Sequence, residues 1–173
     1  NCIDLTGIDH TSTSREMAVS FFLKGGIIRC YRMAARYGPQ AFDKIDEALL
    51  GRTEALEPPV SCAAMVAERV GASPMQNVMA SGLAGGIGLR GGGCGALGAA
   101  IWLTGLKSLE EGAEKLEYKS PRAEEAIELF ASLTDGAFEC SRIVGRRFES
   151  VAEHSAFLRD GGCSEIIEAL AAA

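Results

Sequence analysis

Residues Ser81–Gly105, SGLAGGIGLRGGGCGALGAAIWLTG, decide the fold of this chain. Up to Gly98 the stretch holds nine of the chain's 21 glycines, and Cys94 stands where the glycines give way to an apolar helical pattern. Glycine permits positive φ angles and the close approach of another chain segment or a ligand. We therefore expect a tight turn with something packed closely against the Cys94 thiol. A small-residue contact between helices, with no chemistry, also stays open on spacing alone.

The composition is that of an ordinary globular protein. The 173 residues are 47% hydrophobic and 23% charged, and the length suits one domain with a substantial core. The net charge of −6 argues against nucleic acid as a partner. No apolar run approaches the roughly 18 residues of a membrane span. The chain opens on polar residues rather than a signal peptide, so a cytoplasmic location is the default expectation.

Apolar residues recur with helical spacing along the chain, and no run alternates as a strand would. The sequence therefore predicts an all-α protein, a compact helical bundle in a single domain, 1–173. Within it, residues 1–60 form an N-terminal helical extension and residues 61–173 a four-cysteine redox or metal-binding region. The segment 94–106 is apolar nearly all round, which predicts a buried central helix directly after the glycine-rich turn. Helices are expected at 15–37 (broken at Gly25-Gly26), 42–50, 61–70, 74–79, 94–106, 122–133, 137–148, 151–158 and 163–172.

One nucleotide-binding pattern is present without its required context. Residues Gly86–Gly91, GIGLRG, satisfy G-x-G-x-x-G. That fingerprint works only between a buried strand and a helix in a βαβ unit. No strand is predicted before Gly86, so we do not expect a nicotinamide or flavin site here.

Cysteines are the residues most able to carry chemistry in this chain. No two are close enough for a C-x-x-C motif or local zinc-finger spacing, so any shared site must be assembled by the fold. Several lie at or near predicted helix N-termini, where the helix dipole is expected to lower a thiol pKa. Buried, inert cysteines are the alternative interpretation. The six cysteines are Cys2, Cys30, Cys62, Cys94, Cys140 and Cys163.

The two histidines, His10 and His154, belong to no recognisable Ser–His–Asp arrangement. His154 lies between Cys140 and Cys163 and is the better candidate for a ligand. The residues therefore leave open whether the protein is an enzyme.

Four of the cysteines, with their neighbours, resemble a known family. The chain from Ser61 onward is similar to the redox-active proteins named for their C…GCAxxG…C…C pattern. The second motif reads GCGALG, so Gly95 stands where the pattern has alanine, and both flanking glycines are kept. Cys2 and Cys30 fall outside the pattern. The matched cysteines are Cys62 in SCAA, Cys94 in GCGALG, Cys140 in ECSRI and Cys163 in CSEII.

The resemblance implies a redox or metal-binding role for these four cysteines. An iron–sulfur cluster, or tetrahedral zinc, would be bound by the four thiolates, in electron transfer or redox sensing with a redox partner protein. Gly91, Gly92 and Gly93 would let the backbone approach the bound group. Two other functions stay open: a metal-free thiol–disulfide oxidoreductase, and a non-catalytic interaction module whose cysteines only pack. Helix faces of small residues are also compatible with a homodimer.

Overall fold

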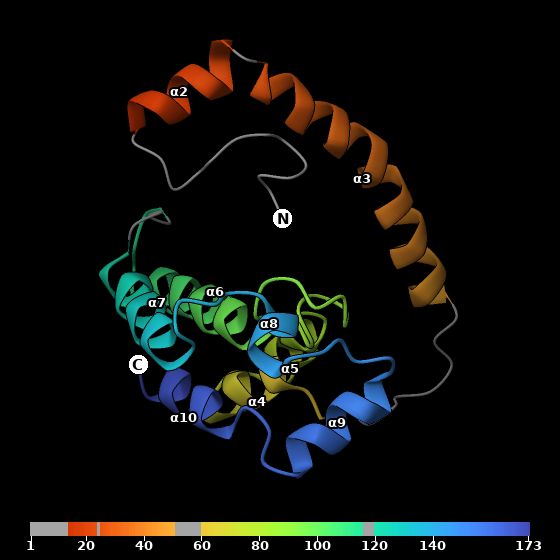
Figure 1. Ribbon diagram of the computed structural model, residues 1–173, viewed down its shortest axis with the longest axis vertical. Coiled ribbons are helices and arrows are strands. Elements are labelled where there is room, and N and C mark those ends of the chain that lie inside the picture. Colours follow the sequence, from red (N-terminus) through yellow and green to blue (C-terminus); the bar gives the residue numbers. More distant parts are fainter. Residues whose placement is uncertain (1–13, 24, 51–59, 116–119) are drawn as a thin grey trace. The chain divides into compact units, whose positions relative to one another are not determined.

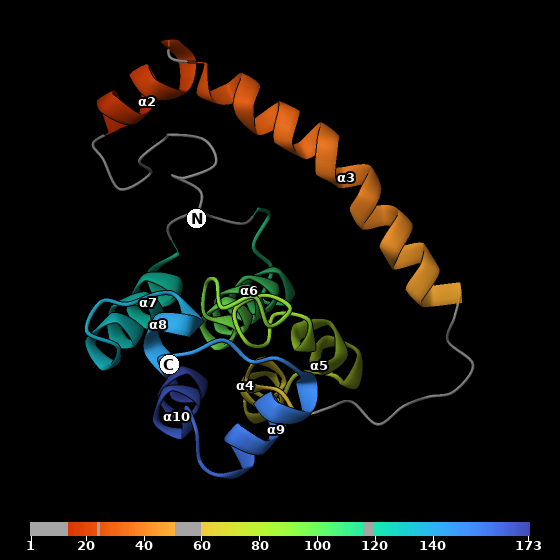
Figure 2. The same ribbon diagram turned by 45° about the vertical axis from the view of Figure 1, so that its right-hand side comes forward.

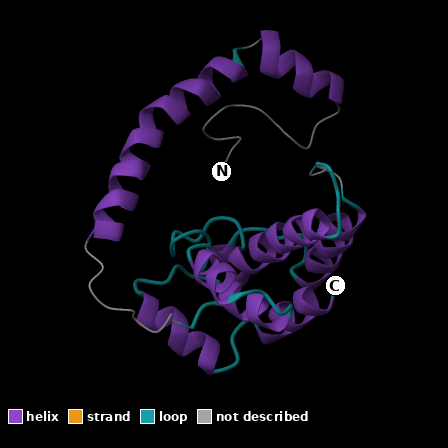
Figure 3. Cartoon of the chain, turned by 180° about the vertical axis from the view of Figure 1, so that it is seen from behind, coloured by secondary structure: helices purple, strands orange, loops and turns teal. Residues whose placement is uncertain are grey.

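The computed structural model describes residues 14–23, 25–50, 60–115 and 120–173. Cys2, His10 and the predicted linker at 51–59 lie outside these ranges. The chain divides into two compact units, Asn1–Leu56 and Glu57–Ala173. Nine helices and no strand occur in the described residues, which confirms the predicted all-α fold (Figure 3). None of the helices described is both long enough and apolar enough to cross a bilayer.

The first unit contains α2 (Ser14–Leu23) and the long helix α3 (Gly26–Leu50). The predicted break between them is confirmed, because Gly25 has a φ of +71°. The predicted separate helix at 42–50 is wrong, since α3 runs without interruption past Pro39. A proline normally excludes the preceding residue from the helical region by clashing with its Cβ and N–H. The preceding residue here is Gly38, which has no Cβ, so one of these two clashes is absent.

The second unit is a bundle around α6 (Figures 1 and 2). Helix α6 packs against α4, α7 and α10, and Ala96, Ala99 and Leu103 on it are buried. The prediction of a buried central helix after the glycine-rich turn is therefore confirmed. The helices of this unit are α4 (Cys62–Arg69), α5 (Pro74–Ser81), α6 (Gly95–Glu110), α7 (Pro121–Leu133), α8 (Cys140–Val144), α9 (Val151–Arg159) and α10 (Ser164–Ala172).

Polar caps fix the start of several helices. The Ser61 hydroxyl accepts a 3.0 Å hydrogen bond from the amide of Ala64 at the start of α4. At α5, Ser73 and Gln76 form a reciprocal capping box, and Pro74 occupies the first turn, as the sequence predicts. These caps place Cys62, directly after Ser61, at the first position of its helix.

The predicted helix at 137–148 is wrong in extent, because only α8, Cys140–Val144, is helical. The two residues before α8 are not helical and pair with the glycine-rich segment. The carbonyl of Phe138 accepts a 2.8 Å hydrogen bond from the amide of Cys94, and Glu139 forms an isolated antiparallel bridge with Gly93. At the other end, Gly145 adopts a left-handed conformation with φ +79° and stops the helix.

Candidate redox and metal centre

Each of the four family-pattern cysteines lies at the start of a different helix. Cys62 and Cys140 are the first residues of α4 and α8. Cys94 and Cys163 are the residues immediately before α6 and α10. The four helices therefore present one thiol each from their N-terminal ends.

The structure brings these four thiols together around one small cavity in the second unit. Cys62 and Cys140 are buried, and Cys94 and Cys163 are half-buried. Repulsion from the charged forms of neighbouring thiols helps to raise the pKa values of Cys62, Cys140 and Cys163, so the sulfurs are near enough to interact. The remaining lining is mostly apolar: Gly95, Ala96, Ile143, Val144, Phe148, His154, Phe157 and Ile166.

Carbonyl groups of the glycine-rich segment accept hydrogen bonds from the start of α8, which fixes the position of Cys140 relative to Cys94. The amide of Cys140 donates to the carbonyl of Gly92 at 2.7 Å, and the amide of Ser141 donates to that of Gly91 at 3.1 Å. The Ser141 hydroxyl also donates to the Gly91 carbonyl at 2.8 Å. The first turn of α8 is thus bound to the segment that leads into Cys94.

The three glycines expected to let the backbone approach the bound group do not line the cavity. They contact α8 and the residue before it instead: Gly91, Gly92 and Gly93. The glycine in the cavity lining is Gly95. A Cβ on Gly95 would overlap the backbone carbonyl of Leu83, which explains why this chain has glycine at that position. The glycines therefore act mainly by letting backbone segments approach one another.

The predicted lowering of the thiol pKa values is wrong. Burial raises the pKa of Cys62 and of Cys94 above the ordinary value, because a thiolate loses its hydration there. Burial and repulsion by the other thiols raise the pKa of Cys140 to about 11 and of Cys163 to about 12. Hydrogen bonds with the backbone of Leu97 and Ala96 act in the opposite direction at Cys94, and desolvation outweighs them.

His154, the predicted ligand candidate, lies on α9 and lines the same cavity as the four cysteines. It is buried, and its ring packs edge-on against Phe148 with 4.9 Å between ring centroids. Phe148 also packs against Phe157 at 5.2 Å. Desolvation lowers the pKa of His154, which favours the neutral imidazole. Nothing in the sequence pattern indicates this aromatic wall, because Phe148 lies in the non-helical segment between α8 and α9, whereas His154 and Phe157 lie on α9.

The other sequence candidates lie elsewhere. Cys30 is half-buried on α3 in the first unit. Among the residues the structure describes, no three or more Cys, His, Asp or Glu side chains are arranged to hold a single metal ion.

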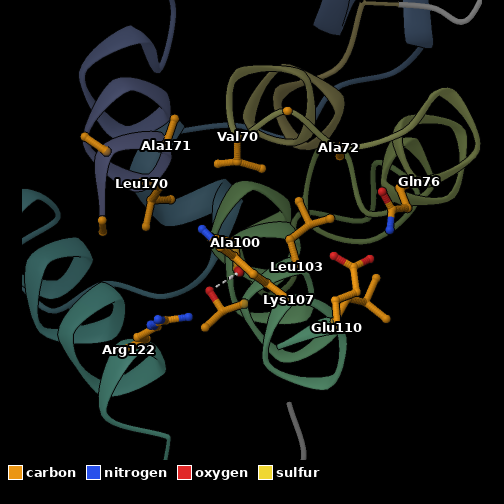
Figure 4. Close-up of a pocket in the computed structure, with 15 residues that line it drawn as sticks. Val70, Ala72, Gln76, Ala100, Leu103, Lys107, Glu110, Arg122, Leu170 and Ala171 are labelled. Atoms are coloured by element: carbon orange, nitrogen blue, oxygen red, sulfur yellow. Dashed lines mark hydrogen bonds between the residues drawn. The ribbon is translucent and has the colours of Figure 1, made fainter. Parts of the chain in front are cut away.

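A larger cleft of about 530 Å³ lies in the same unit but contains no cysteine. Figure 4 shows it between α6, α7, α10 and the link from α4 to α5. Its lining includes Lys107 and Glu110 of α6 and Arg122 of α7, which pairs with Glu111 at 2.9 Å. The cysteine cavity is the better candidate for redox chemistry, because thiols are the groups in this unit that bind soft metals and exchange electrons.

Four cysteines from four helix starts, enclosed by apolar side chains, supply the donor set for a group bound by thiolates, although they are not arranged to hold a single metal ion. The fold and site therefore define a small all-α protein with a buried four-cysteine centre. The chain belongs to the family described as "Putative redox-active protein (C_GCAxxG_C_C)", whose sequence model matches residues 57–173. No curated protein and no solved structure matches the chain significantly.

Proposed function

We propose that this protein binds an iron–sulfur cluster through Cys62, Cys94, Cys140 and Cys163 and acts in electron transfer or redox sensing. The observation that carries the proposal is the convergence of the four thiols on one enclosed cavity. Thiolates suit both zinc and iron–sulfur clusters. Zinc has no redox chemistry, so membership of a family described as redox-active favours iron.

The chain's own residues would contribute in three ways. The four thiols would lose their protons to the medium and supply negative ligands. The N-terminal ends of α4, α6 and α10, directed at three of the thiols, would offset part of that charge. Phe148, Phe157 and Ile166 would exclude water from the site. The bound cluster would supply the one-electron chemistry.

A metal-free thiol–disulfide oxidoreductase is less well supported. Disulfide exchange needs a thiolate as the attacking group. Burial raises the pKa of all four thiols in the folded protein and so disfavours the thiolate. A metal ion can displace such protons, whereas a disulfide substrate has no equivalent way to do so.

The test is anaerobic purification of the full chain, followed by a visible spectrum and assays for iron, zinc and sulfide. We expect a coloured protein with iron and sulfide, and loss of both in Cys94→Ser. The matched control is Cys30→Ser, which removes a thiol from α3 in the other unit and should leave the spectrum unchanged.

Three results would contradict the proposal. A colourless protein that contains zinc would show that the cysteines bind zinc and not an iron–sulfur cluster. A metal-free protein whose free thiols fall by two on mild oxidation would favour the disulfide oxidoreductase, and one whose thiols do not respond would favour an interaction module with packed cysteines.

A further inference from the structure

Helix α3 carries an apolar seam with the spacing of a coiled coil. Alternating steps of three and four residues keep side chains on one face of a helix that packs against another helix. The large side chains of the seam are exposed, by 51 to 72%. The seam residues are Ile28, Tyr31, Ala35, Gly38, Phe42 and Ile45.

The charges on α3 are divided between its two halves. Arg29, Arg32 and Arg36 lie in the N-terminal half, which has no acidic residue. The C-terminal half contains Lys44, which pairs with Glu47, together with Asp43 and Asp46. One half is thus basic and the other carries a net negative charge.

The ends of α3 lack the charges that the helix dipole favours. Basic residues near a helix N-terminus and acidic residues near its C-terminus are both unfavourable. The first turn of α3 has no acidic residue and the last turn has no basic residue, so neither end is compensated within the helix. An antiparallel copy of α3 would place the acidic half of one helix beside the basic half of the other and compensate both ends.

Gly38 precedes Pro39 in α3, and among the described residues no atom is packed against it. A Cβ at this position would meet nothing within 4 Å, and its φ is not positive. Glycine in a helix interior is nevertheless unfavourable by about 1 kcal/mol relative to alanine. Small residues at the middle of the seam, Ala35 and Gly38, would allow two helices to approach closely.

From these observations we propose that α3 binds α3 of a second copy of this chain as an antiparallel two-helix coiled coil. With the register centred between Arg36 and Tyr37, Tyr31 lies opposite Phe42 of the second copy, and Ile28 opposite its Ile45. Ala35 and Gly38 then face each other at the twofold axis. Both copies then use the same residues in the interface, as a twofold symmetric dimer requires. This proposal is independent of the proposed function, since it uses no residue of the second unit.

The oligomeric state of the full chain tests the proposal, by sedimentation velocity over a range of concentrations. We expect a dimer, and a monomer for the double variant Tyr31→Glu/Phe42→Glu. Gln40→Glu, away from the seam, is the control and should remain dimeric. Circular dichroism and the fluorescence of Trp102, the single tryptophan, report whether each variant remains folded.

A charge exchange tests the antiparallel orientation. In this register Arg32 of one copy and Asp46 of the other lie on the same side of the seam, five residues apart along the helix axis, a separation that a long arginine side chain can span. Arg32→Glu and Asp46→Arg should each raise the dimer dissociation constant about threefold, since each turns an attraction at two symmetric places into a repulsion. The double variant should restore dimerisation. A parallel dimer would give no such restoration, and would overturn the proposed arrangement.

A monomer at every concentration would overturn the proposal outright. The full chain should then be sedimented with vesicles of phosphatidylserine and phosphatidylcholine, because an amphipathic helix with basic residues can also bind an anionic membrane. Binding of a monomer to the vesicles would assign the seam to a lipid surface. Absence of binding would indicate that other parts of the same chain cover the seam. The dimer is excluded in both cases, because the protein is a monomer.

Discussion

The backbone amide of Cys140 donates a 2.7 Å hydrogen bond to the carbonyl of Gly92, two residues before Cys94. The reverse connection also exists, because the amide of Cys94 donates to the carbonyl of Phe138, two residues before Cys140. Two cysteines that are distant in sequence are thus joined through their own backbones. The glycine-rich segment makes this possible by approaching the start of α8 without side chains.

This arrangement predicts different effects of alanine at two neighbouring glycines. Gly91 has a φ of +72°, and a Cβ there would lie 2.8 Å from the Cβ of Ser141 and the Cγ of Arg147. Gly91→Ala should therefore lower the free energy of unfolding by about 2 kcal/mol or more. Urea denaturation followed by Trp102 fluorescence, which reports on α6, measures this change.

Gly93→Ala is the matched control. Gly93 has no positive φ, and a Cβ there would meet nothing within 4 Å. Its unfolding free energy should stay within about 0.5 kcal/mol of the parent protein. Equal losses in the two variants would show that contact with α8 is not what requires Gly91.

The raised thiol pKa values predict that the metal-free, reduced protein loses stability in alkali. The unfolded chain releases its thiol protons near the ordinary value of 9.0, whereas Cys140 in the folded protein releases its proton only near about 11. Stability is therefore complete below pH 9 and falls as the pH rises toward 11. Cys140 alone should account for a loss approaching about 3 kcal/mol, since its pKa is raised from 9.0 to about 11 and each pH unit is worth about 1.4 kcal/mol.

Urea midpoints between pH 8 and pH 11 give the measurement. The variant Cys140→Ala should have a flatter alkaline limb than the parent, whatever its stability at neutral pH. Cys30→Ala should reproduce the parent's slope. Parallel curves for all three proteins would mean that the Cys140 thiol ionises as easily in the folded chain as in the unfolded one.

His154 predicts an opposite dependence on the acid side. Its pKa is lowered by burial, so the folded protein favours the neutral imidazole. The unfolded chain takes up a proton near pH 6.5, and stability should decline as the pH falls below that value. His154→Phe keeps an aromatic ring against Phe148 and removes the titration. Its unfolding free energy should fall less between pH 7 and pH 5 than that of the parent, and an identical fall would contradict the assignment.

The elements were predictable from the sequence where the signal is local. Ser73-Pro74 with Gln76 specifies a helix start, and the apolar segment after Cys94 specifies a central helix. The pairing of residues 138–139 with the glycine-rich segment was not predictable, because it depends on contacts between distant backbones. The direction of the thiol pKa shifts was missed for a related reason: a helix N-terminus is visible in the sequence, but the burial that outweighs it is created by tertiary packing.

The backbone of Cys163, immediately before α10, is strained. It has a φ of +58°, in the left-handed region, where a residue with a Cβ is less stable than glycine by roughly 1–2 kcal/mol. Cys163→Ala and Cys163→Gly both remove the thiol, but only the glycine variant relieves the strain. The glycine variant should therefore unfold at higher urea, with an unfolding free energy about 1 kcal/mol above that of the alanine variant. Both should bind less iron than the parent, since both lack one of the four proposed ligands. If the alanine variant proved the more stable, the left-handed turn before α10 would not be the source of strain.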